Sequence, residues 1–226
     1  MLGERLSQLV TFEALKVAAG VMLLSPCLPL LFMGEEYGET APFPYFISHL
    51  DAVLVEAVRR GRREEFRAFH WQGVSPDPQD DTTFQSAKLK HHLRQQGQYG
   101  VLRAFYKELI RLRRTLPALT QLHKDCMEVT SFEEPKVLCV RRWSPDDASA
   151  TVMICHFGSQ PTTASVPLPP GAWHKCLDSA APEWGGPGRM EPSTLSGGVA
   201  WLTLAPWVVL LFTQESRGPA GASEHV

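Results

Sequence analysis

The chain lacks the excess of positive charge that is typical of proteins that bind nucleic acids or anionic membrane surfaces. Lysine and arginine together number 22 and the acidic residues 24, so the formal net charge of the 226-residue chain is -2. A nearly neutral chain offers no electrostatic reason to expect binding to nucleic acid or to an anionic membrane. Charged residues make up 20% of the sequence and hydrophobic residues 44%, a balance typical of a soluble globular protein with a sizeable core.

Cysteine is scarce, and its spacing argues against a zinc site or a disulfide framework. The cysteines are odd in number, and no two of them form a C-x-x-C motif: Cys27, Cys126, Cys139, Cys155 and Cys176. Reduced, mostly buried thiols in a cytoplasmic protein are therefore expected. The eight histidines form no metal-ligand pattern, and neither a G-x-S-x-G elbow nor a glycine-rich phosphate loop is present. We expect no metal and no cofactor.

Long hydrophobic runs are also missing. The most apolar stretch, Val17–Met33, is shorter than the roughly 20 residues that span a bilayer, and Pro26 and Pro29 interrupt it. Charged side chains lie where a signal peptide would need a clean apolar core. We therefore expect no membrane segment, and the cytoplasm is the expected location.

The first part of the chain predicts a helix followed by a buried strand. In Glu4–Leu24 apolar residues recur every three or four positions, which indicates a helix that ends before Pro26. Leu28–Met33 is apolar at successive positions, so it predicts a strand buried on both faces, as in a parallel sheet or barrel. Such a strand needs neighbours to pair its backbone groups, and the sequence supplies only one convincing helix-strand unit.

Two further helical regions follow. Asp51–Phe69 predicts two short pieces, with Asp51 as the N-cap and Gly61 between them. Its arginine cluster is balanced by neighbouring glutamates, which favours a solvated face over a phosphate or nucleic-acid site. Tyr99–Thr115 carries one apolar stripe and predicts a strong amphipathic helix that Pro117 stops.

After Leu122 the helical periodicity gives way to short β-rich runs separated by turns. About seven such runs predict an antiparallel sandwich over residues 122–214. Residues 215–226 are polar and glycine-rich, so they are predicted to be disordered. The runs are Met127–Phe132, Val137–Trp143, Thr151–Phe157, Thr162–Val166, Trp173–Leu177, Val199–Leu204 and Val208–Phe212.

Glu35 and Glu36 follow the predicted strand and are the first carboxylates to consider for catalysis. A retaining glycosidase needs two carboxyl groups about 5–5.5 Å apart across the scissile bond. Adjacent side chains on a strand point to opposite faces, so this pair is not expected to supply the acid and the nucleophile. We expect one of them to bind hydroxyl groups of a ligand or to orient a catalytic group, and the other to make a structural hydrogen bond.

Two motifs carry a resemblance to known enzymes. Pro29–Gly38 (P-L-L-F-M-G-E-E-Y-G) resembles the eighth barrel strand of α-amylase superfamily glucan enzymes, and Pro76–Gln79 resembles a signature of the malto-oligosyltrehalose trehalohydrolase family. After this signature the family continues with Thr-Phe-x-x-Ser-Lys-Leu and an aspartate–tryptophan pair. This chain keeps the Thr-Phe and Lys-Leu pairs but departs at Ala87, Lys90 and His91.

The resemblance implies a mixed α+β fold. Residues 1–121 would be the C-terminal segment of a TIM (β/α)8 barrel, comprising its last helix-strand units, and residues 122–214 the β-sandwich that follows the barrel. The family's three catalytic carboxylates follow barrel strands four, five and seven and have no counterpart here. The resemblance therefore implies no catalytic residue in this chain, which alone is expected to be inactive.

The resemblance also implies a substrate and its contacts. Family members cleave the α-1,4-glucosidic bond next to the terminal trehalose of malto-oligosyltrehalose and release trehalose. The aromatic loop Tyr37–Leu50 corresponds to a segment near the sugar cleft, although its rings could equally pack the loop onto the barrel. The residues expected to bind substrate are Glu35, Glu36, Tyr37, Phe43, Phe46 and His49.

Several alternatives stay open. The chain could be a non-catalytic module that binds α-glucan or docks onto a subunit carrying the rest of the barrel. It could derive from a glucan branching or debranching enzyme, although Pro76–Gln79 weighs against this. It could also be a gene fragment, since Met1 falls inside what resembles a helix-leading loop. The partners expected are α-glucan or malto-oligosyltrehalose and the missing N-terminal catalytic portion, with neither nucleic acid nor membrane.

Overall fold

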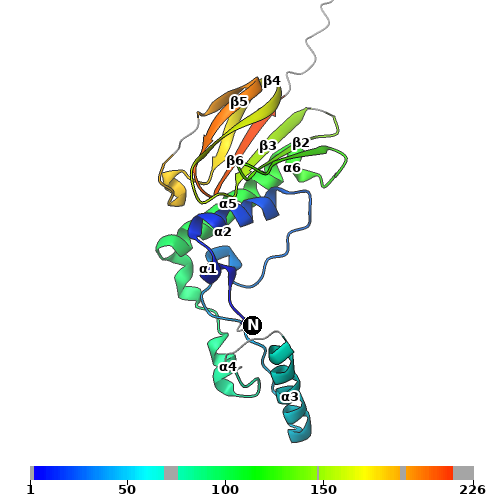
Figure 1. The fold of residues 1–226 in the computed structure, drawn as a ribbon, viewed down its shortest axis with the longest axis vertical. Helices are drawn as coiled ribbons and strands as arrows, with labels where there is room; N and C mark the ends of the chain where they lie inside the picture. Colours follow the sequence, from blue (N-terminus) through cyan, green and yellow to red (C-terminus); the bar gives the residue numbers. More distant parts are fainter. Residues whose placement is uncertain (1–2, 69–75, 147, 189–191, 216–226) are drawn as a thin grey trace, which may run out of the picture. The chain divides into compact units, whose positions relative to one another are not determined.

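The computed structural model describes residues 3–68, 76–146, 148–188 and 192–215 (Figure 1). The chain forms two compact units, the first of residues 1–11 and 31–100 and the second of residues 12–30 and 101–226. The units are groups of residues that contact one another, and each consists of two separate stretches of the chain. They therefore do not test the domain boundary expected between residues 121 and 122, which stays a prediction. Apart from Glu215, the tail predicted to be disordered lies outside the described residues.

The described part of the first unit contains helices and irregular segments but no strand. Its helix α5 (Gly97–Thr115) begins here and continues in the second unit, so the predicted helix Tyr99–Thr115 is confirmed. The other helical segments of this unit are α1 (Leu6–Leu9), η1 (Glu35–Tyr37), α3 (Ala52–Ala68), α4 (Asp81–Ser86) and η2 (His91–Gln95).

Helix α3 corrects one prediction and confirms another. It is a single helix of 17 residues, so the predicted break at Gly61 is wrong. An internal glycine costs a helix only about 1 kcal/mol relative to alanine, too little to divide a helix of this length. The predicted cap is confirmed, because Oδ1 of Asp51 accepts from the backbone N–H of Val53 at 2.8 Å and of Leu54 at 3.3 Å.

The strand predicted at Leu28–Met33 is wrong. These residues pair with no strand in the described part of the chain, and several of them are open to solvent. Leu28 is 82% exposed, Leu30 89% and Met33 52%. A strand buried on both faces exists only where neighbouring strands satisfy its backbone groups. Here no described residues provide them, so the barrel portion of the expected fold is not observed.

The second unit consists of helices and one antiparallel sheet. The helix predicted over Glu4–Leu24 is broken, because Val10 is extended between α1 and α2. The helical segments of this unit, besides α5, are α2 (Phe12–Leu24), α6 (Pro117–Thr120) and η3 (Pro182–Trp184). The strands are β1 (Met127–Phe132), β2 (Val137–Trp143), β3 (Ser149–His156), β4 (Thr162–Asp178), β5 (Thr194–Leu204) and β6 (Val208–Glu215).

The six strands form one sheet in the order β1-β2-β3-β6-β4-β5. Two of the seven predicted runs, Thr162–Val166 and Trp173–Leu177, are parts of the single strand β4. The two prolines and the glycine between these runs were expected to end the first strand. Instead, the strand continues, and its pairing with β5 shifts in register between Leu168 and Ala172. A bulge of this kind lets a strand pass residues that cannot join the hydrogen-bond ladder. The two separate sheets of a sandwich are not observed.

The strands bury two apolar clusters, one on each face of the sheet. The first lies among the strands themselves and includes Trp173, Leu202 and Phe212. The second joins the strands to α2 and α5, which lie beside the sheet in Figure 1. Leu23 of α2 and Leu109 of α5 are buried in it. The amphipathic stripes of these helices therefore cover one face of the sheet, and burying them supplies much of the driving force for folding of this unit.

Two arginines hold the C-terminal end of α2. Arg113 donates from Nη1 to the carbonyl of Leu23 at 2.5 Å, and Arg142 donates from Nη1 to that of Leu24 at 2.8 Å. The last carbonyls of a helix lack intrahelical partners and carry partial negative charge, so cations are favoured there. Burial, followed by the nearby charge of Arg113, lowers the pKa of Arg142 to about 10.

Candidate functional site

The residues predicted to bind substrate lie in the first unit, around a tight turn. Gly34 and Gly38 flank the short helix η1 with φ values of 86° and 75°. Such left-handed conformations favour glycine, because a Cβ crowds the neighbouring backbone. A Cβ on Gly34 would also lie 2.7 Å from Cβ of Glu39. Two glycines therefore allow the chain to reverse at this turn.

Glu39 is the buried centre of this turn. Its side chain is 1% exposed. Oε1 accepts from the backbone N–H of Thr40 at 2.7 Å and of Ala41 at 2.8 Å, while Oε2 accepts from the Tyr37 hydroxyl at 2.7 Å and the Lys90 N–H at 2.6 Å. Burial raises the pKa of this carboxyl, but the four hydrogen bonds outweigh it and hold the pKa below its ordinary value. Glu39 thus joins two distant parts of the unit.

Tyr37 is the buried partner of Glu39, to which its hydroxyl donates a hydrogen bond. It is fully buried, and the guanidinium of Arg94 lies 5.3 Å from the centre of its ring. Burial and the hydrogen bond to Glu39 raise the pKa of Tyr37 to about 12. Because the ring is covered in this structure, direct contact between Tyr37 and a sugar stays a prediction.

Glu35 and Glu36 are half-buried on η1. Oε2 of Glu35 accepts from the backbone N–H of Phe32 at 3.0 Å, which closes the turn from the other side. Successive side chains on a 3₁₀-helix point about 120° apart, so the two carboxylates diverge. This geometry agrees with the expectation that they do not act as an acid–nucleophile pair, and their contact with a sugar stays a prediction.

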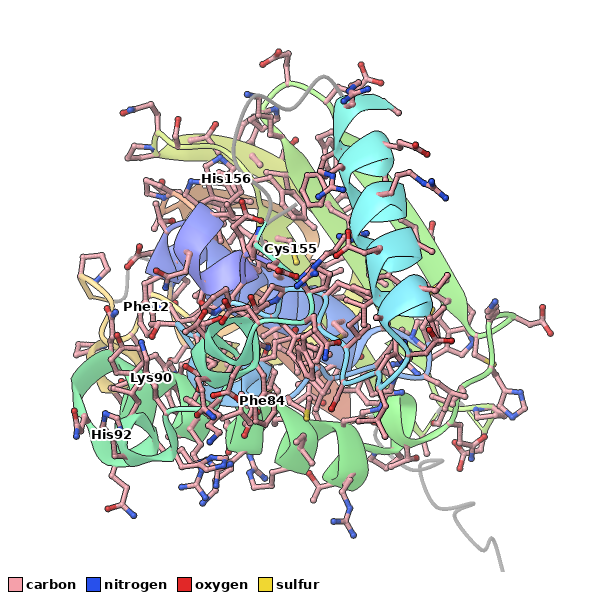
Figure 2. The ribbon with its side chains drawn as sticks, turned by 90° about the horizontal axis from the view of Figure 1, so that it is seen from below. Phe12, Phe84, Lys90, His92, Cys155 and His156 are labelled. Atoms are coloured by element: carbon pink, nitrogen blue, oxygen red, sulfur yellow. The ribbon has the colours of Figure 1, made fainter. Side chains whose placement is uncertain are left out.

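Four phenylalanines form a row along this unit, which we call the aromatic row: Phe32, Phe43, Phe46 and Phe84. Neighbouring ring centres are 5.0, 5.8 and 5.3 Å apart in edge-to-face contacts. Phe32 is 43% exposed, Phe43 37% and Phe84 42%, whereas Phe46 is half-buried, so three of the four rings are open to solvent. Phe84 is labelled in Figure 2. Aromatic faces that are both fixed and exposed suit the apolar faces of sugar rings.

Arg5 connects the two chain segments that carry Phe32 and Phe43. Its guanidinium donates from Nη1 to the carbonyl of Met33 at 2.7 Å and from Nε to that of Ala41 at 2.9 Å. It also lies 4.7 Å from the ring centre of Phe32 and 5.8 Å from that of Phe43. One buried arginine thus fixes both the turn and the first two rings.

The Pro76–Gln79 signature braces the segment that follows. The Ile47 N–H donates to the carbonyl of Pro78 at 2.7 Å. Gln79 and His49 exchange two hydrogen bonds, from Nε2 of Gln79 to the carbonyl of His49 at 3.1 Å and from the His49 N–H back to Oε1 at 3.2 Å. These contacts use the backbone of His49 and leave its exposed side chain without a role in them.

Asp77 links the same signature to α3. It accepts from Nε of Arg59 at 2.9 Å and from Nη2 at 2.6 Å, a two-pronged pair. The hydrogen bonds from Arg59 hold the pKa of Asp77 below its usual range. The signature therefore fixes both α3 and the aromatic segment within this unit.

The sequence indicated some of these residues and missed others. Phe43 and Phe46 were predicted and do contact each other, but Phe32 was assigned to a strand and Phe84 to a linker motif. Glu39 was passed over, although it stands in the acidic cluster after Gly34. A sequence shows that an acid is present, but not that four donors converge on it.

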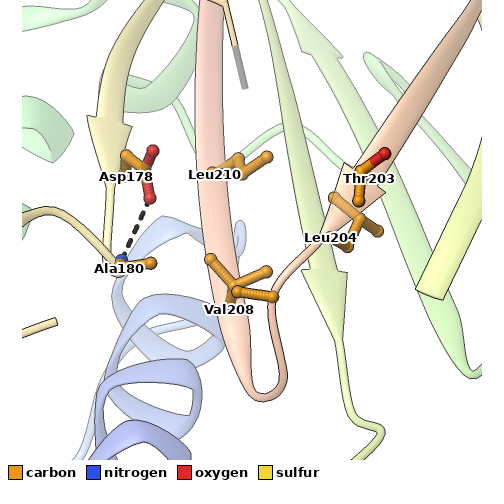
Figure 3. A pocket seen from close by; sticks show the side chains of 7 residues that line it. Asp178, Ala180, Thr203, Leu204, Val208 and Leu210 are labelled. Carbon is orange, nitrogen blue, oxygen red and sulfur yellow. Dashed lines mark hydrogen bonds between the residues drawn. The ribbon is translucent and has the colours of Figure 1, made fainter. Parts of the chain in front are cut away.

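The second unit contains a small cavity, whose lining side chains are drawn in Figure 3. Its volume is about 10 Å³, which is roughly the space of one water molecule and far too small for a sugar. Oδ1 of Asp178 accepts from the Ala180 N–H at 3.0 Å beside it. None of the helices in the described segments combines the length and apolarity that crossing a bilayer requires.

Comparisons with known proteins agree with this picture. A family model described as a domain of unknown function, DUF3459, matches residues 130–211. A crystal structure of a candidate alpha amylase from Salmonella typhimurium superposes with a TM-score of 0.72 and 28% identity, over 94% of this chain and 32% of that one. An α-amylase from H. orenii, at 16% identity and a TM-score of 0.54 over 91% of this chain and 36% of that one, shows the same fold.

These matches relate the chain to glycoside hydrolases of the α-amylase class. Within that class its curated relatives are malto-oligosyltrehalose trehalohydrolases, so the resemblance seen in the sequence is confirmed. The enzyme from Mycobacterium tuberculosis (strain H37Rv) is 36% identical over 166 residues, which is 73% of this chain and 28% of the relative. That from Saccharolobus solfataricus is 44% identical over 112 residues, 50% of this chain and 18% of the relative. The chain thus spans less than a third of their length.

Proposed function

We propose that this chain is a portion of a glycoside hydrolase that cleaves the α-1,4-glucosidic bond next to the terminal trehalose of malto-oligosyltrehalose and releases trehalose. The similarity to trehalohydrolases carries this proposal, and it is supported by the braced Pro76–Gln79 signature beside the aromatic row. The proposed partners are the oligosaccharide and a separate catalytic portion. The cytoplasm stays the expected location, on the argument from scattered cysteines.

Within this proposal, the aromatic row contacts the glucose rings. Phe43 and Phe46 stack on sugar faces, and Phe32 and Phe84 extend the platform at either end. Glu35, Glu36 and His49 supply polar contacts to hydroxyl groups, while Tyr37 acts through Glu39 by holding the turn in place. The exposure of three of the four rings supports this assignment.

The chain alone is proposed to be inactive. Glu35 and Glu36 diverge on η1, and Glu39 has both oxygens occupied by hydrogen bonds. Neither the Glu35–Glu36 pair nor Glu39 is therefore placed to act as acid and nucleophile on one bond.

Incubation of the purified 226-residue chain with malto-oligosyltrehalose, with trehalose measured by an enzymatic assay, tests the inactivity. We expect no trehalose above the no-protein control. Turnover comparable to that of a full-length trehalohydrolase would refute this part of the proposal. Adding the complementary N-terminal portion of such an enzyme should restore trehalose release if that portion is the partner.

A second candidate function is that of a non-catalytic α-glucan-binding module. The partly exposed aromatic row, beside the divergent pair Glu35 and Glu36, favours it. Affinity electrophoresis through gels containing glycogen tests both candidates, because both need the row to bind glucan. We expect Phe43→Ala to migrate faster than the unchanged chain in glycogen, and Leu54→Ala, an exposed residue on α3, to serve as the matched control.

A further inference from the structure

The β4–β5 hairpin of the second unit exposes a tryptophan. Trp201 on β5 is 73% exposed, and Val199 on the same strand is 65% exposed. The other described tryptophans are buried or half-buried, and Trp173 on β4 is fully buried in the cluster among the strands. Trp201 and Val199 lie two residues apart on one strand and together leave a contiguous apolar patch, and such patches often mark a binding site.

The pairing register shows which side chains surround the indole. Trp201 stands opposite Ser165, Val199 opposite Pro167, and Thr203 opposite Thr163. Side chains alternate along a strand, so these residues share one face, whereas the residues between them point into the core. We call this face, made of Thr163, Ser165, Pro167, Val199, Trp201 and Thr203, the Trp201 face.

The Trp201 face is electrically neutral. Across the paired segments 162–168 and 198–204, no described residue carries a charged side chain. Three hydroxyl groups lie around one indole and two small apolar side chains. This composition suits a neutral, hydroxyl-rich ligand, whose apolar C–H groups meet the indole while its hydroxyls meet serine and threonine.

The face is also accessible at one side. β5 is the last strand of the sheet, so no described strand pairs beyond it. A second protein copy is a poorer occupant, because one indole buries roughly 150–250 Å² and two small neighbours leave the face far below the roughly 1,000 Å² that a specific interface needs. A slender polymer can instead lie along an edge strand with few contacts.

We propose that the Trp201 face is a second glucan-binding surface, which takes the neutral α-1,4-glucan chain by stacking a glucose ring on Trp201. It lies in the second unit and shares no residue with the aromatic row. The proposal rests on the proposed function only for the class of ligand, because the relatives are named for a malto-oligosaccharide derivative.

The test is glycogen affinity electrophoresis of the full 226-residue chain with Trp201→Ala, alone and combined with Phe43→Ala. We expect Trp201→Ala to weaken the apparent affinity by about tenfold in both backgrounds, since the two sites are independent. Trp201→Phe should recover part of the loss by keeping a ring. Val129→Ala, an exposed residue on the opposite edge strand β1, is the matched control and should change nothing.

The outcomes separate this proposal from the one before it. If Trp201→Ala leaves retardation unchanged in both backgrounds while Phe43→Ala reduces it, the Trp201 face is refuted and the aromatic row stands. The reverse pattern supports the face and counts against the row. If the unchanged chain is not retarded, both sites fail. A dimer in sedimentation velocity that Trp201→Ala dissociates without altering retardation would assign the face to a second copy and overturn the proposal.

Discussion

The two units are held together by different chemistry. The second has a sheet with an apolar cluster on each face, filled by leucine, valine and aromatic side chains. The first has no strand in its described residues and depends on buried or braced polar groups, above all Glu39 and Arg5. Apolar burial is spread over many contacts, whereas a polar centre concentrates its contribution in a few hydrogen bonds. The units should therefore respond differently to substitution and to pH.

The largest expected effect lies in the apolar unit. Leu109→Ala on α5 removes a fully buried side chain, so the free energy of unfolding should fall by about 2–5 kcal/mol. Urea denaturation followed by tryptophan fluorescence measures it. Leu30→Ala, at a residue 89% exposed, is the control and should stay within about 0.5 kcal/mol. Equal effects of the two substitutions would contradict the packing described for this unit.

The polar centre of the first unit is the next most sensitive point. Glu39→Gln replaces one acceptor oxygen with an NH₂ group that faces N–H donors, so we expect a loss of about 1–3 kcal/mol. Hydrogen exchange of the amides in residues 34–41 measures it locally. Glu36→Gln makes the same chemical change at a half-buried carboxylate and should leave this protection intact. Unchanged protection in Glu39→Gln would show that Glu39 does not hold the turn.

The next largest effect is expected from a substitution at Gly34. Gly34→Ala places a Cβ in a left-handed conformation, which costs about 1–2 kcal/mol, and brings that atom against Glu39. Thermal unfolding of the first unit, followed by exchange of its amides, should begin at a lower temperature. A variant as stable as the original chain would mean that the turn adopts another conformation.

Lowering the pH should reveal a difference in stability between the two units without any substitution. The pKa of Glu39 is lower in the folded chain than its ordinary value of 4.5, so its contribution to stability is present above that pH and is lost as the pH falls further. We expect amides near Glu39 to lose protection on acidification before the amides of β6 do. In Glu39→Gln the difference in acid sensitivity between these two sets of amides should shrink. An unchanged difference would mean that another carboxylate causes the loss of protection.

The smallest expected effect has the opposite sign. Gly61 lies inside α3 with open space where a Cβ would stand, so Gly61→Ala should stabilise the chain by about 0.5–1 kcal/mol. Circular dichroism at the helical minimum during a thermal scan measures it. Together with Gly34→Ala, it shows whether glycine is required at a position or merely tolerated there.

The sequence predicted the second unit better than the first. Strands β1 and β2 have the predicted bounds, and α5 contains the predicted helix, because alternation and helical periodicity both reflect burial against one face. β4 was predicted as two runs, since the bulge that carries the chain past Pro169 and Pro170 depends on pairing with β5. Local pattern therefore sufficed wherever one face met an apolar core.

In the first unit local pattern was less informative. Leu28–Met33 has the composition of a buried strand, but burial needs partners that composition cannot supply. Phe43 and Phe46 stood out by residue type, while Phe84 became part of the aromatic row only through contacts between distant segments. The convergence on Glu39 from Lys90, 51 residues away, has no local signal at all.

The open apolar segment Leu28–Met33 has a practical consequence for handling the chain. Proteases bind their substrates as extended, accessible peptides, and cleavage concentrates where backbone is exposed and unpaired. A protease that cuts after leucine should therefore nick the chain at Leu28 or Leu30, which are 82% and 89% exposed. Each of the two fragments would contain residues of both units, so the nick would test whether the folded chain stays together without a continuous backbone.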